Sequence, residues 1–459
     1  MVPLSDTIAA VATGGGASAV GIVRVSGSCA IEAADAVFRA ANRKRLADAE
    51  NRRMYYGEIM GAGGGIIDLC LCVVSRAPCS YTGEDTVEFH CHGSPVILSE
   101  ALGALFSLGV RQAEAGEFTK RAFLNGRMDL TQAEAVIDLI EAETPSAARN
   151  AAGQLRGAIK DKLEAVYSSL LNVVAHFHAV IDYPDEDIDD FEMKSYLPGL
   201  RGAEEELRRI LSTHEHGKVL RDGIPTAIIG RPNTGKSSLL NALLGFDRAI
   251  VAELPGTTRD TIEEKILVRG VALRLIDTAG LRKTGNKVEK LGMERTLAAL
   301  RGAGLVILVL DGSEPLQSGD HYALRSIPPG IPKLAAINKS DLPDALAPDV
   351  VAQLGIEHCR VSALTGEGLD VFDAKIEKMF PEFAAPPSGG IITNARHAEA
   401  VSRAISGVGL AIEAINASVT PDAVLTDIES ALAAIGEVTG KTMREDVISR
   451  VFERFCVGK

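Results

Sequence analysis

The segment from Gly230 to Ser237 has the residue types and the spacing of a phosphate-binding loop. It reads Gly-Arg-Pro-Asn-Thr-Gly-Lys-Ser, which matches the pattern G-x-x-x-x-G-K-[ST]. The apolar run 227–229 precedes it and an amphipathic helical pattern follows it, so strand, loop and helix come in the required order. Backbone N–H groups at a helix N-terminus bind phosphate oxygens. We expect Lys236 to reach the β- and γ-phosphates and the Ser237 hydroxyl to bind Mg²⁺.

Three further motifs follow in the order typical of GTPases of the translation-factor class. IDTAG at 276–280 and NKSD at 338–341 each end a predicted strand, and SAL at 362–364 is placed to support the base. Asp277 can hold Mg²⁺ through water. The Asp341 carboxylate can accept hydrogen bonds from N1–H and N2–H₂ of guanine, and with adenine a buried carboxylate would be left unsatisfied. The residues expected to bind GTP are Asn233, Thr234, Gly235, Lys236, Ser237, Ser238, Ala252, Glu253, Leu254, Pro255, Gly256, Thr257, Thr258, Asp277, Thr278, Ala279, Gly280, Asn338, Lys339, Ser340, Asp341, Ser362, Ala363 and Leu364.

The position that carries a water-orienting Gln in many GTPases is Leu281 in this chain. A leucine side chain cannot form hydrogen bonds, so another group must stabilise the charge that develops during hydrolysis. The amide oxygen of Asn233 suits a monovalent cation that would neutralise this charge. Thr258 is the predicted switch I threonine, which closes on Mg²⁺ and the γ-phosphate. Glu289 is a candidate for positioning water; the alternative is that it is a solvated carboxylate of switch II. The candidate catalytic residues are therefore Lys236, which reaches the phosphates, together with Thr258 and Glu289.

The composition excludes several classes of protein. The chain of 459 residues has a net charge of −13, which argues against indiscriminate binding of nucleic acid but allows an RNA partner held by a local basic patch. It has no Trp and only 4% aromatic residues, which favours helices and α/β packing. No apolar run reaches the roughly 18–20 residues that span a bilayer. The N-terminus lacks the basic start of a signal peptide, and the seven cysteines are expected to be reduced thiols in the cytoplasm.

The sequence pattern changes along the chain in a way that predicts several domains. Residues 1–120 alternate short β-like runs with Gly-rich turns, as in an α+β domain, and 121–220 are helical. Residues 221–383 alternate strands and helices, which predicts a doubly wound parallel sheet, and 384–459 return to helix. An α/β domain inserted into a helical domain explains this order. In the first domain, strands are expected at 20–27, 68–74 and 85–93 and helices at 29–41 and 94–108.

The helical parts have their own local signals. Apolar residues recur at helical spacing from Leu130 to Thr144, where Thr131 and Glu134 form a capping-box pattern. Helices are also predicted over 145–180 and 197–216, and then, after a Pro- and Gly-rich linker at 381–390, over 394–416 and 421–459.

Over nearly its whole length the chain resembles the MnmE (TrmE) family of tRNA-modifying GTPases. The segments that carry the resemblance are YTGEDTVEFHCHGSPV (81–96), GEFTKRAFLNGRMDLTQAEAVIDLI (116–140), GRPNTGKSSLLNALLG (230–245), PGTTRD (255–260), DTAGLR (277–282) and FCVGK (455–459). The resemblance implies a folate-binding N-terminal α+β domain, a helical domain with the inserted GTPase domain, and a homodimer formed through the N-terminal domains.

The resemblance also implies a function. Members of this family work with MnmG, an FAD-dependent partner, and add a carboxymethylaminomethyl group to C5 of the wobble uridine of certain tRNAs. The one-carbon unit comes from a tetrahydrofolate derivative of the 5-formyl or methylene type, and K⁺-dependent dimerisation of the GTPase domains accelerates GTP hydrolysis. A ribosome-assembly or RNA-binding regulatory GTPase is the alternative, and folate binding separates the two.

The family's functional residues transfer to positions of this chain. The resemblance implies folate binding by Arg24, Glu88, Arg127 and Lys459, Mg²⁺ binding by Ser237 and Thr258, and K⁺ binding by Asn233, Ala252, Leu254 and Thr257. Arg127 stands where relatives often have Lys, so a planar fork replaces a point charge. Cys456 takes part in modification chemistry or is a thiol packed against the last helix; the sequence leaves both open.

Two other clusters are weighed against simpler explanations. A metal site is suggested by Cys70, Cys72, Cys79, Cys91, His90 and His92, but strand alternation puts Cys91 opposite the two histidines, so no metal is expected there. The basic run 39–46, with Arg52 and Arg53, either contacts tRNA phosphates or forms a solvated helix face.

Overall fold

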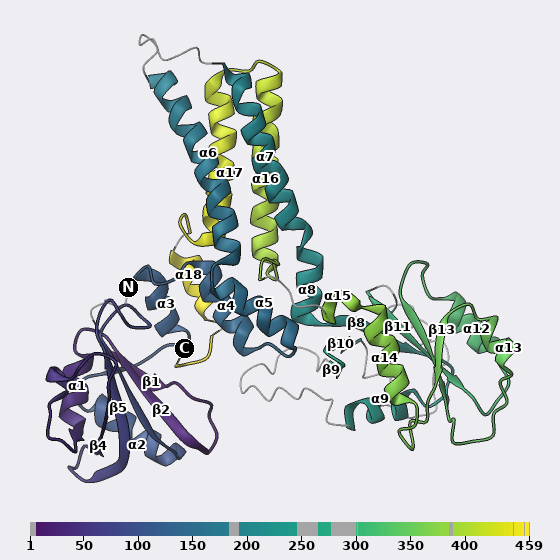
Figure 1. The fold of residues 1–459 in the computed structure, drawn as a ribbon, viewed down its shortest axis with the longest axis horizontal. Coiled ribbons are helices and arrows are strands. Elements are labelled where there is room, and N and C mark those ends of the chain that lie inside the picture. The colour runs from purple at the N-terminus through teal and green to yellow at the C-terminus, as the bar shows by residue number, and fades with distance from the viewer. Residues whose placement is uncertain are drawn as a thin grey trace. The chain divides into compact units, whose positions relative to one another are not determined.

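The chain forms two compact units in the computed structural model. The model describes residues 6–182, 192–245, 265–276, 300, 302–384, 389–443, 445–453 and 455–458 (Figure 1). The first unit comprises Met1–Ile137, Leu155–Ala203 and Arg403–Lys459, and the second comprises Asp138–Gln154 and Glu204–Ser402. No helix in these described ranges combines the length and the hydropathy that a membrane crossing would need.

A seven-stranded sheet organises the N-terminal part of the first unit. Its strands are β1 (Ile8–Val11), β2 (Ser18–Ser26), β3 (Phe38–Ala40), β4 (Met54–Met60), β5 (Ile66–Ser75), β6 (Thr86–Gly93) and β7 (Arg111–Gln112), in the order β3-β4-β5-β6-β2-β1-β7. Neighbouring strands are antiparallel except β1 and β7. The helices α1 (Ala30–Val37) and α2 (Pro95–Phe106) contribute to the core on one face of this sheet. The expected strands are therefore confirmed.

Strand alternation decides which residues this sheet presents on its other face. Val23 and Val25 of β2 lie in the core beneath the helices, as do Val87 and Phe89 of β6. Because successive side chains of a strand point to opposite faces, the residues between them point away from that core. Arg24 and Glu88 hold these intervening positions and are direct cross-strand partners.

The helix predicted over 29–41 is wrong in its last four residues, 38–41. Helix α1 ends at Val37, and Phe38–Ala40 form β3, which pairs with β4. The aromatic ring of Phe38 lies 5.9 Å from that of Phe89 in the core, and this tertiary packing outweighs the local helical pattern. The basic run 39–46 therefore does not lie on a helix face; only the short 3₁₀ turn Leu46–Asp48 follows β3.

Helices make up the rest of the first unit. They include α3 (Glu117–Leu124), α6 (Ala158–Asp182), α17 (Pro421–Thr439) and α18 (Glu445–Phe452). Four further helices contain residues of both units: α4 (Leu130–Ile140), α5 (Pro145–Leu155), α7 (Leu197–Ser212) and α16 (Ala395–Asn416). Within the first unit, α6 and α17 run side by side (Figure 1). The helix predicted over 421–459 is interrupted, because Gly440 has a φ of +89° that favours glycine and ends α17.

The capping box of α4 differs from the predicted one. Asp129 Oδ1 accepts hydrogen bonds from the Gln132 N–H at 2.9 Å and the Thr131 hydroxyl at 2.7 Å, and the Gln132 side chain accepts from the Asp129 N–H at 3.0 Å. The prediction of Thr131 and Glu134 is therefore wrong. Both pairs have capping spacing, and Asp129 caps because it directly precedes the first helical residue.

A six-stranded sheet organises the second unit. Its strands are β8 (Ile224–Ile229), β9 (Lys265–Val268), β10 (Val271–Leu275), β11 (Leu305–Asp311), β12 (Lys333–Asn338) and β13 (Glu357–Arg360), in the order β13-β12-β11-β8-β10-β9. All pairs are parallel except β9 with β10. Besides α4, α5, α7 and α16, the described helices of this unit are α8 (His214–Asp222), α9 (Lys236–Gly245), α12 (Ser318–Arg325), α13 (Pro348–Ala352), α14 (Leu369–Met379) and α15 (Pro381–Ala384).

Helices cover both faces of this second sheet. Residues of α9 and α14 share one core cluster with Ile228 and Ile307, and residues of α12 and α13 share another with Ile229 and Leu308. A sheet of mostly parallel strands with helices on both faces is the doubly wound arrangement that the alternating pattern predicts. The edge strand β9 is the one antiparallel exception among the described strands of this sheet.

Candidate functional site

The loop from Gly230 to Ser237 connects β8 to α9 and has a backbone that two glycines make possible. Gly230 has a φ of +149°, and a Cβ there would lie 2.3 Å from the Val309 carbonyl oxygen. Gly235 has a φ of +90°, and a Cβ there would lie 2.1 Å from Asn338 Nδ2. Any other residue at these positions would clash with neighbouring strands, so the glycines shape the loop that leads into the N-terminus of α9.

Lys236 lies across this loop. Its ammonium donates hydrogen bonds to the carbonyl oxygens of Gly230 at 2.9 Å and Arg231 at 2.5 Å. Burial lowers the pKa of Lys236, and the nearby Arg231 charge lowers it further. The arrangement holds a positive charge beside the backbone N–H groups at the start of α9, which suits the phosphate-binding role expected of Lys236.

The base-recognition motifs meet this loop through Asn338. Its Nδ2 donates to the Thr234 carbonyl at 2.9 Å, and its Oδ1 accepts from the Ala363 N–H at 3.0 Å. The Ser362 hydroxyl donates to Asp341 Oδ1 at 2.5 Å. One buried amide therefore joins the phosphate loop to the SAL segment, and Asp341 is oriented beside it. Asp341 itself is exposed, whereas the sequence argument assumed a buried carboxylate.

The sequence analysis missed two carboxylates of this site, Asp311 and Asp320, which pair with Lys339 and Arg231. Lys339 has a φ of +67°, and its ammonium pairs with Asp311 Oδ2 at 2.5 Å. Although burial alone would raise it, the pKa of Asp311 is lowered overall by hydrogen bonds from Lys339 and Ser313. Arg231 Nε likewise donates to the buried Asp320 at 2.8 Å. A signal for Asp311 existed, because it ends an apolar strand in register with Asn338.

The remaining predicted nucleotide residues divide into two groups. Among the described ones, Asn233 is exposed with a φ of +64°, Ser238 and Leu364 are exposed, and the Ser340 N–H donates to the Val361 carbonyl. Those outside the described residues are Ala252, Glu253, Leu254, Pro255, Gly256, Thr257, Thr258, Asp277, Thr278, Ala279, Gly280, Leu281 and Glu289.

A second candidate site lies on the sheet face opposite α1 and α2. Arg24 Nε donates to Glu88 Oε1 at 2.7 Å, directly across β2 and β6. The Arg24 guanidinium lies 5.2 Å from the centre of the Tyr81 ring and 5.5 Å from that of Phe118. His90 Nε2 lies 3.6 Å from Glu88 Oε2. A half-buried charge pair beside aromatic faces can bind a flat, polar-edged ring.

The C-terminal tail reaches this domain instead of continuing as a helix. Val457 forms a β-bridge with Ala115, and the Gly116 N–H donates to the Cys456 carbonyl at 3.3 Å. Gly458 has a φ of +100°, and a Cβ there would lie 2.0 Å from the carbonyl oxygen of Val11, the last residue of β1. The tail therefore ends beside the strand that pairs with Arg24. Cys456 is exposed rather than packed, and Lys459 lies outside the described residues.

Arg127 approaches from the end of α3. It is exposed, and a Cβ on Gly83 would lie 3.2 Å from its Cγ, so its stem packs against the loop before β6. Arg127 is thus connected to the Arg24 site through that loop.

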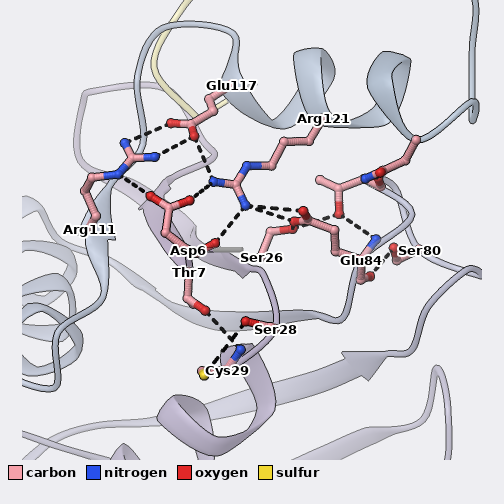
Figure 2. A network of polar contacts seen from close by, with 12 residues as sticks. Asp6, Thr7, Ser26, Ser28, Cys29, Ser80, Glu84, Arg111, Glu117 and Arg121 are labelled. Atoms are coloured by element: carbon pink, nitrogen blue, oxygen red, sulfur yellow. Dashed lines mark hydrogen bonds and ion pairs between the residues drawn. The ribbon is translucent and has the colours of Figure 1, made fainter. Parts of the chain in front are cut away.

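A partly buried network of charges lies beside this second site (Figure 2). Arg121, whose side chain is only 3% exposed, pairs with Asp6 at 2.6 Å, Glu117 at 2.9 Å and Glu84 at 3.1 Å. Arg111 pairs with Asp6 at 2.6 Å and with Glu117 at 2.7 Å. Buried charges need such partners, and this network joins the N-terminal segment to α3 and to the loop before β6.

The network makes the stability of the protein depend on pH. Burial alone would raise the pKa values of Asp6 and Glu117, but hydrogen bonds from Arg111 and Arg121 lower both overall. A carboxylate with a lowered folded-state pKa stabilises the fold above its unfolded pKa of about 4, and that stability is lost as pH falls through the folded value. We expect Arg111→Gln to lower the melting temperature by about 2–4 °C at pH 7 and by much less at pH 3. A difference that stays constant from pH 7 to pH 3 would contradict this.

The cysteines and histidines of the suspected metal cluster lie in different environments. Among the described residues, no group of three or more His, Cys, Asp and Glu side chains could hold a metal ion. Cys70, Cys72 and Cys91 are buried in the core beneath the helices, whereas His92 is exposed and pairs with Asp68. The expected separation of Cys91 from the histidines is confirmed.

Comparisons with known proteins agree over the whole chain. The family model described as MnmE helical domain matches residues 130–456, and the model described as GTP-binding protein TrmE N-terminus matches residues 7–127. The tRNA modification GTPase MnmE of Natranaerobius thermophilus is 41% identical over 458 residues, covering 99% of both chains. That of Carboxydothermus hydrogenoformans is 41% identical over 461 residues, covering 99% of this chain and 100% of the relative. The phosphate loop, the guanine motif and these full-length matches together place the chain in the MnmE (TrmE) family of tRNA modification GTPases.

Proposed function

We propose that this GTPase, together with an MnmG-type FAD protein, adds a carboxymethylaminomethyl-type group to C5 of uridine 34 in certain tRNAs. The one-carbon unit would come from a tetrahydrofolate derivative of the 5-formyl or methylene type. The observation that carries the proposal is the Arg24–Glu88 pair beside two aromatic rings on the sheet face opposite α1 and α2. A GTPase that only assembles ribosomes has no need for such a site.

The side chains at this face fit a reduced pterin. The Glu88 carboxylate can accept two hydrogen bonds from the amino-pyrimidine edge, and Arg24 holds that carboxylate in place at 2.7 Å. Tyr81 and Phe118 offer ring faces against which a flat ring can pack. Arg127 and Lys459 are assigned to the carbonyl or carboxylate groups of the folate. When bound, the folate supplies the one-carbon unit, and Cys456, exposed on the tail beside β1, is assigned a part in the modification chemistry.

At the nucleotide site we assign Mg²⁺ to Ser237 and Thr258, and K⁺ to Asn233, Ala252, Leu254 and Thr257. The exposed Asn233, with its left-handed backbone in the phosphate loop, carries an amide oxygen, the kind of donor that hard cations bind. These ions supply charge that stabilises the transition state of phosphoryl transfer. Lys236 binds and orients the phosphates, Thr258 closes over them, and Glu289 positions water.

The same sheet supports the proposal of a homodimer through the N-terminal domains. Met54, Tyr56, Leu69 and Leu71 of β4 and β5 are 39–55% exposed. Tyr56 pairs directly with Leu71, so these residues form a contiguous apolar surface, and such surfaces mark protein interfaces. We expect Tyr56→Glu with Leu71→Glu to convert a dimer into a monomer in sedimentation velocity. A monomeric wild type would contradict this proposal.

The folate assignment has a direct test. Glu88→Ala should weaken the binding of 5-formyltetrahydrofolate, measured by calorimetry, by about tenfold or more, because it removes a charge-assisted hydrogen-bond acceptor. Glu58→Ala, at a half-buried position on β4, is the matched control and should leave affinity unchanged. A wild-type chain that ignores reduced folates, or that binds ribosomal subunits without any folate affinity, would favour the ribosome-assembly alternative.

The reaction itself is tested in cells. Mass spectrometry of tRNA wobble nucleosides should show loss of the C5 modification when the gene is removed. The domains assigned to these roles are 1–120 for folate and dimerisation, 121–220 and 384–459 for the helical domain, and 221–383 for GTP. We place the protein in the cytoplasm, where its tRNA substrate is found.

A further inference from the structure

The segment Ser80–Glu84, here called the SYTGE loop, links two residues of the proposed folate site. The Arg24 guanidinium lies over the ring of Tyr81, and its Cζ is 5.2 Å from the centre of that ring. Gly83, with a φ of +80°, packs against the stem of Arg127, because a Cβ there would lie 3.2 Å from Arg127 Cγ. One short loop therefore contacts the guanidinium of Arg24 and the stem of Arg127.

The half-buried carboxylate of Glu84 anchors the end of this loop. Glu84 Oε2 accepts hydrogen bonds from Arg121 Nη1 at 3.1 Å and from the Ser26 hydroxyl at 2.8 Å (Figure 2). The side chains of Arg121 and Glu84 are only 3% and 15% exposed. A hydrogen bond to an ionised group is stronger than one between neutral groups, and shielding from water strengthens it further, so these contacts hold the end of the loop firmly.

Neutral hydrogen bonds hold the middle of the SYTGE loop. The hydroxyls of Thr82 and Ser26 lie 2.7 Å apart, and Asn125 Nδ2 donates to the Thr82 carbonyl at 2.8 Å. The hydroxyl of Tyr81 lies 2.9 Å from that of Thr119 on α3. Ser26 is on the same strand as Arg24, so Glu84 and Thr82 both tie the loop to the strand that carries the site.

Arg121 is oriented for this role by residues outside the loop. Its Nη2 donates to Asp6 Oδ1 at 2.6 Å and to Glu117 Oε1 at 2.9 Å. Glu117 lies on α3, one helical turn before Arg121. Glu84 and Glu117 thus contact the same guanidinium, but only Glu84 belongs to the SYTGE loop. This difference provides a matched pair of carboxylates for a test.

We propose that Glu84 is a positioning residue for folate binding, which holds the SYTGE loop so that Tyr81 supports Arg24 and Gly83 supports Arg127. Glu84 acts through the loop and through Arg121, not by contact with the ligand. The inference rests on the proposed folate site and adds to it a residue that acts on the site without contacting the ligand. It also gives a role to the buried Arg121 and its three acidic partners.

The test compares variants of the full chain for binding of 5-formyltetrahydrofolate by calorimetry, with a melting temperature for each. Glu84→Gln should weaken binding by about tenfold, the scale of one charge-assisted hydrogen bond. Asn125→Ala, which removes an exposed anchor of the same loop, should weaken it about threefold at an unchanged melting temperature. Glu117→Gln should lower the melting temperature but change affinity by less than about twofold.

Each outcome bears on the proposal. If the wild type binds the folate and Glu84→Gln binds it equally well, the positioning role is overturned. It is also overturned if Glu84→Gln and Glu117→Gln lose affinity in parallel with stability, because the network then only holds the domain together. If Glu84→Gln does not fold, an unchanged affinity of Asn125→Ala overturns the proposal. A wild type without folate affinity defeats the proposed function itself and this inference with it.

Discussion

Asp341→Asn is expected to weaken GTP binding by about a thousandfold and to transfer the preference of the protein to xanthosine triphosphate. The Asp341 carboxylate accepts from two guanine donors, whereas an asparagine amide must present a donor to one of them. Xanthine has an oxygen where guanine has the N2 amino group, so it restores the pairing with asparagine. Dissociation constants for the two nucleotides, measured by displacement of a fluorescent analogue, give the change in preference.

Ser362→Ala is the control for this experiment. It removes only the hydroxyl that donates to Asp341 Oδ1 at 2.5 Å. We expect a loss of GTP affinity of about fivefold with the preference for guanine kept, because the carboxylate stays in place but is less well oriented. Unchanged GTP affinity in Asp341→Asn would contradict the assigned contact with the base.

Asn233→Ala is expected to abolish the stimulation of GTP hydrolysis by K⁺. At equal ionic strength the wild type should turn over GTP faster in K⁺ than in Na⁺, by about a hundredfold, the scale of one group that stabilises transition-state charge. The variant should hydrolyse GTP at the slow rate in both salts, because the chain has a leucine where many GTPases have the water-orienting glutamine. Steady-state rates of phosphate release at saturating GTP measure the effect.

Pro232→Ala provides the matched variant in the same loop. Pro232 is exposed beside Asn233 but has no side-chain oxygen to offer a cation. This variant should keep the difference between K⁺ and Na⁺. Equal wild-type rates in the two salts would remove the cation mechanism altogether.

The local motifs could be predicted because their chemistry is contained in a few adjacent residues. Gly230 and Gly235 are needed for backbone angles that other residues avoid, and an apolar run before them predicts the strand. The strand that ends in NKSD was found for the same reason. Where two local patterns compete, as at the start of α4, the sequence does not decide between them: Asp129 and Gln132 form the capping box instead of Thr131 and Glu134.

Contacts between distant segments could not be predicted in this way. Asp311 reaches Lys339 because two parallel strands end in register, and Phe38 forms a strand because its ring packs on Phe89. The tail was expected to be helical, but Gly458 instead lies beside Val11 of β1. Each of these depends on the pairing of segments that lie far apart in the chain, and no local pattern records it.

The residues from Gly230 to Ser237 were enough to predict a phosphate loop for a guanine nucleotide, since turn, strand and donor pattern are local properties of the chain. The way Arg24, Glu88 and the SYTGE loop come together beside a network of charges emerged only from the folded chain. The reason is physical: burial and strand pairing set which charges meet, and both arise when the chain folds as a whole.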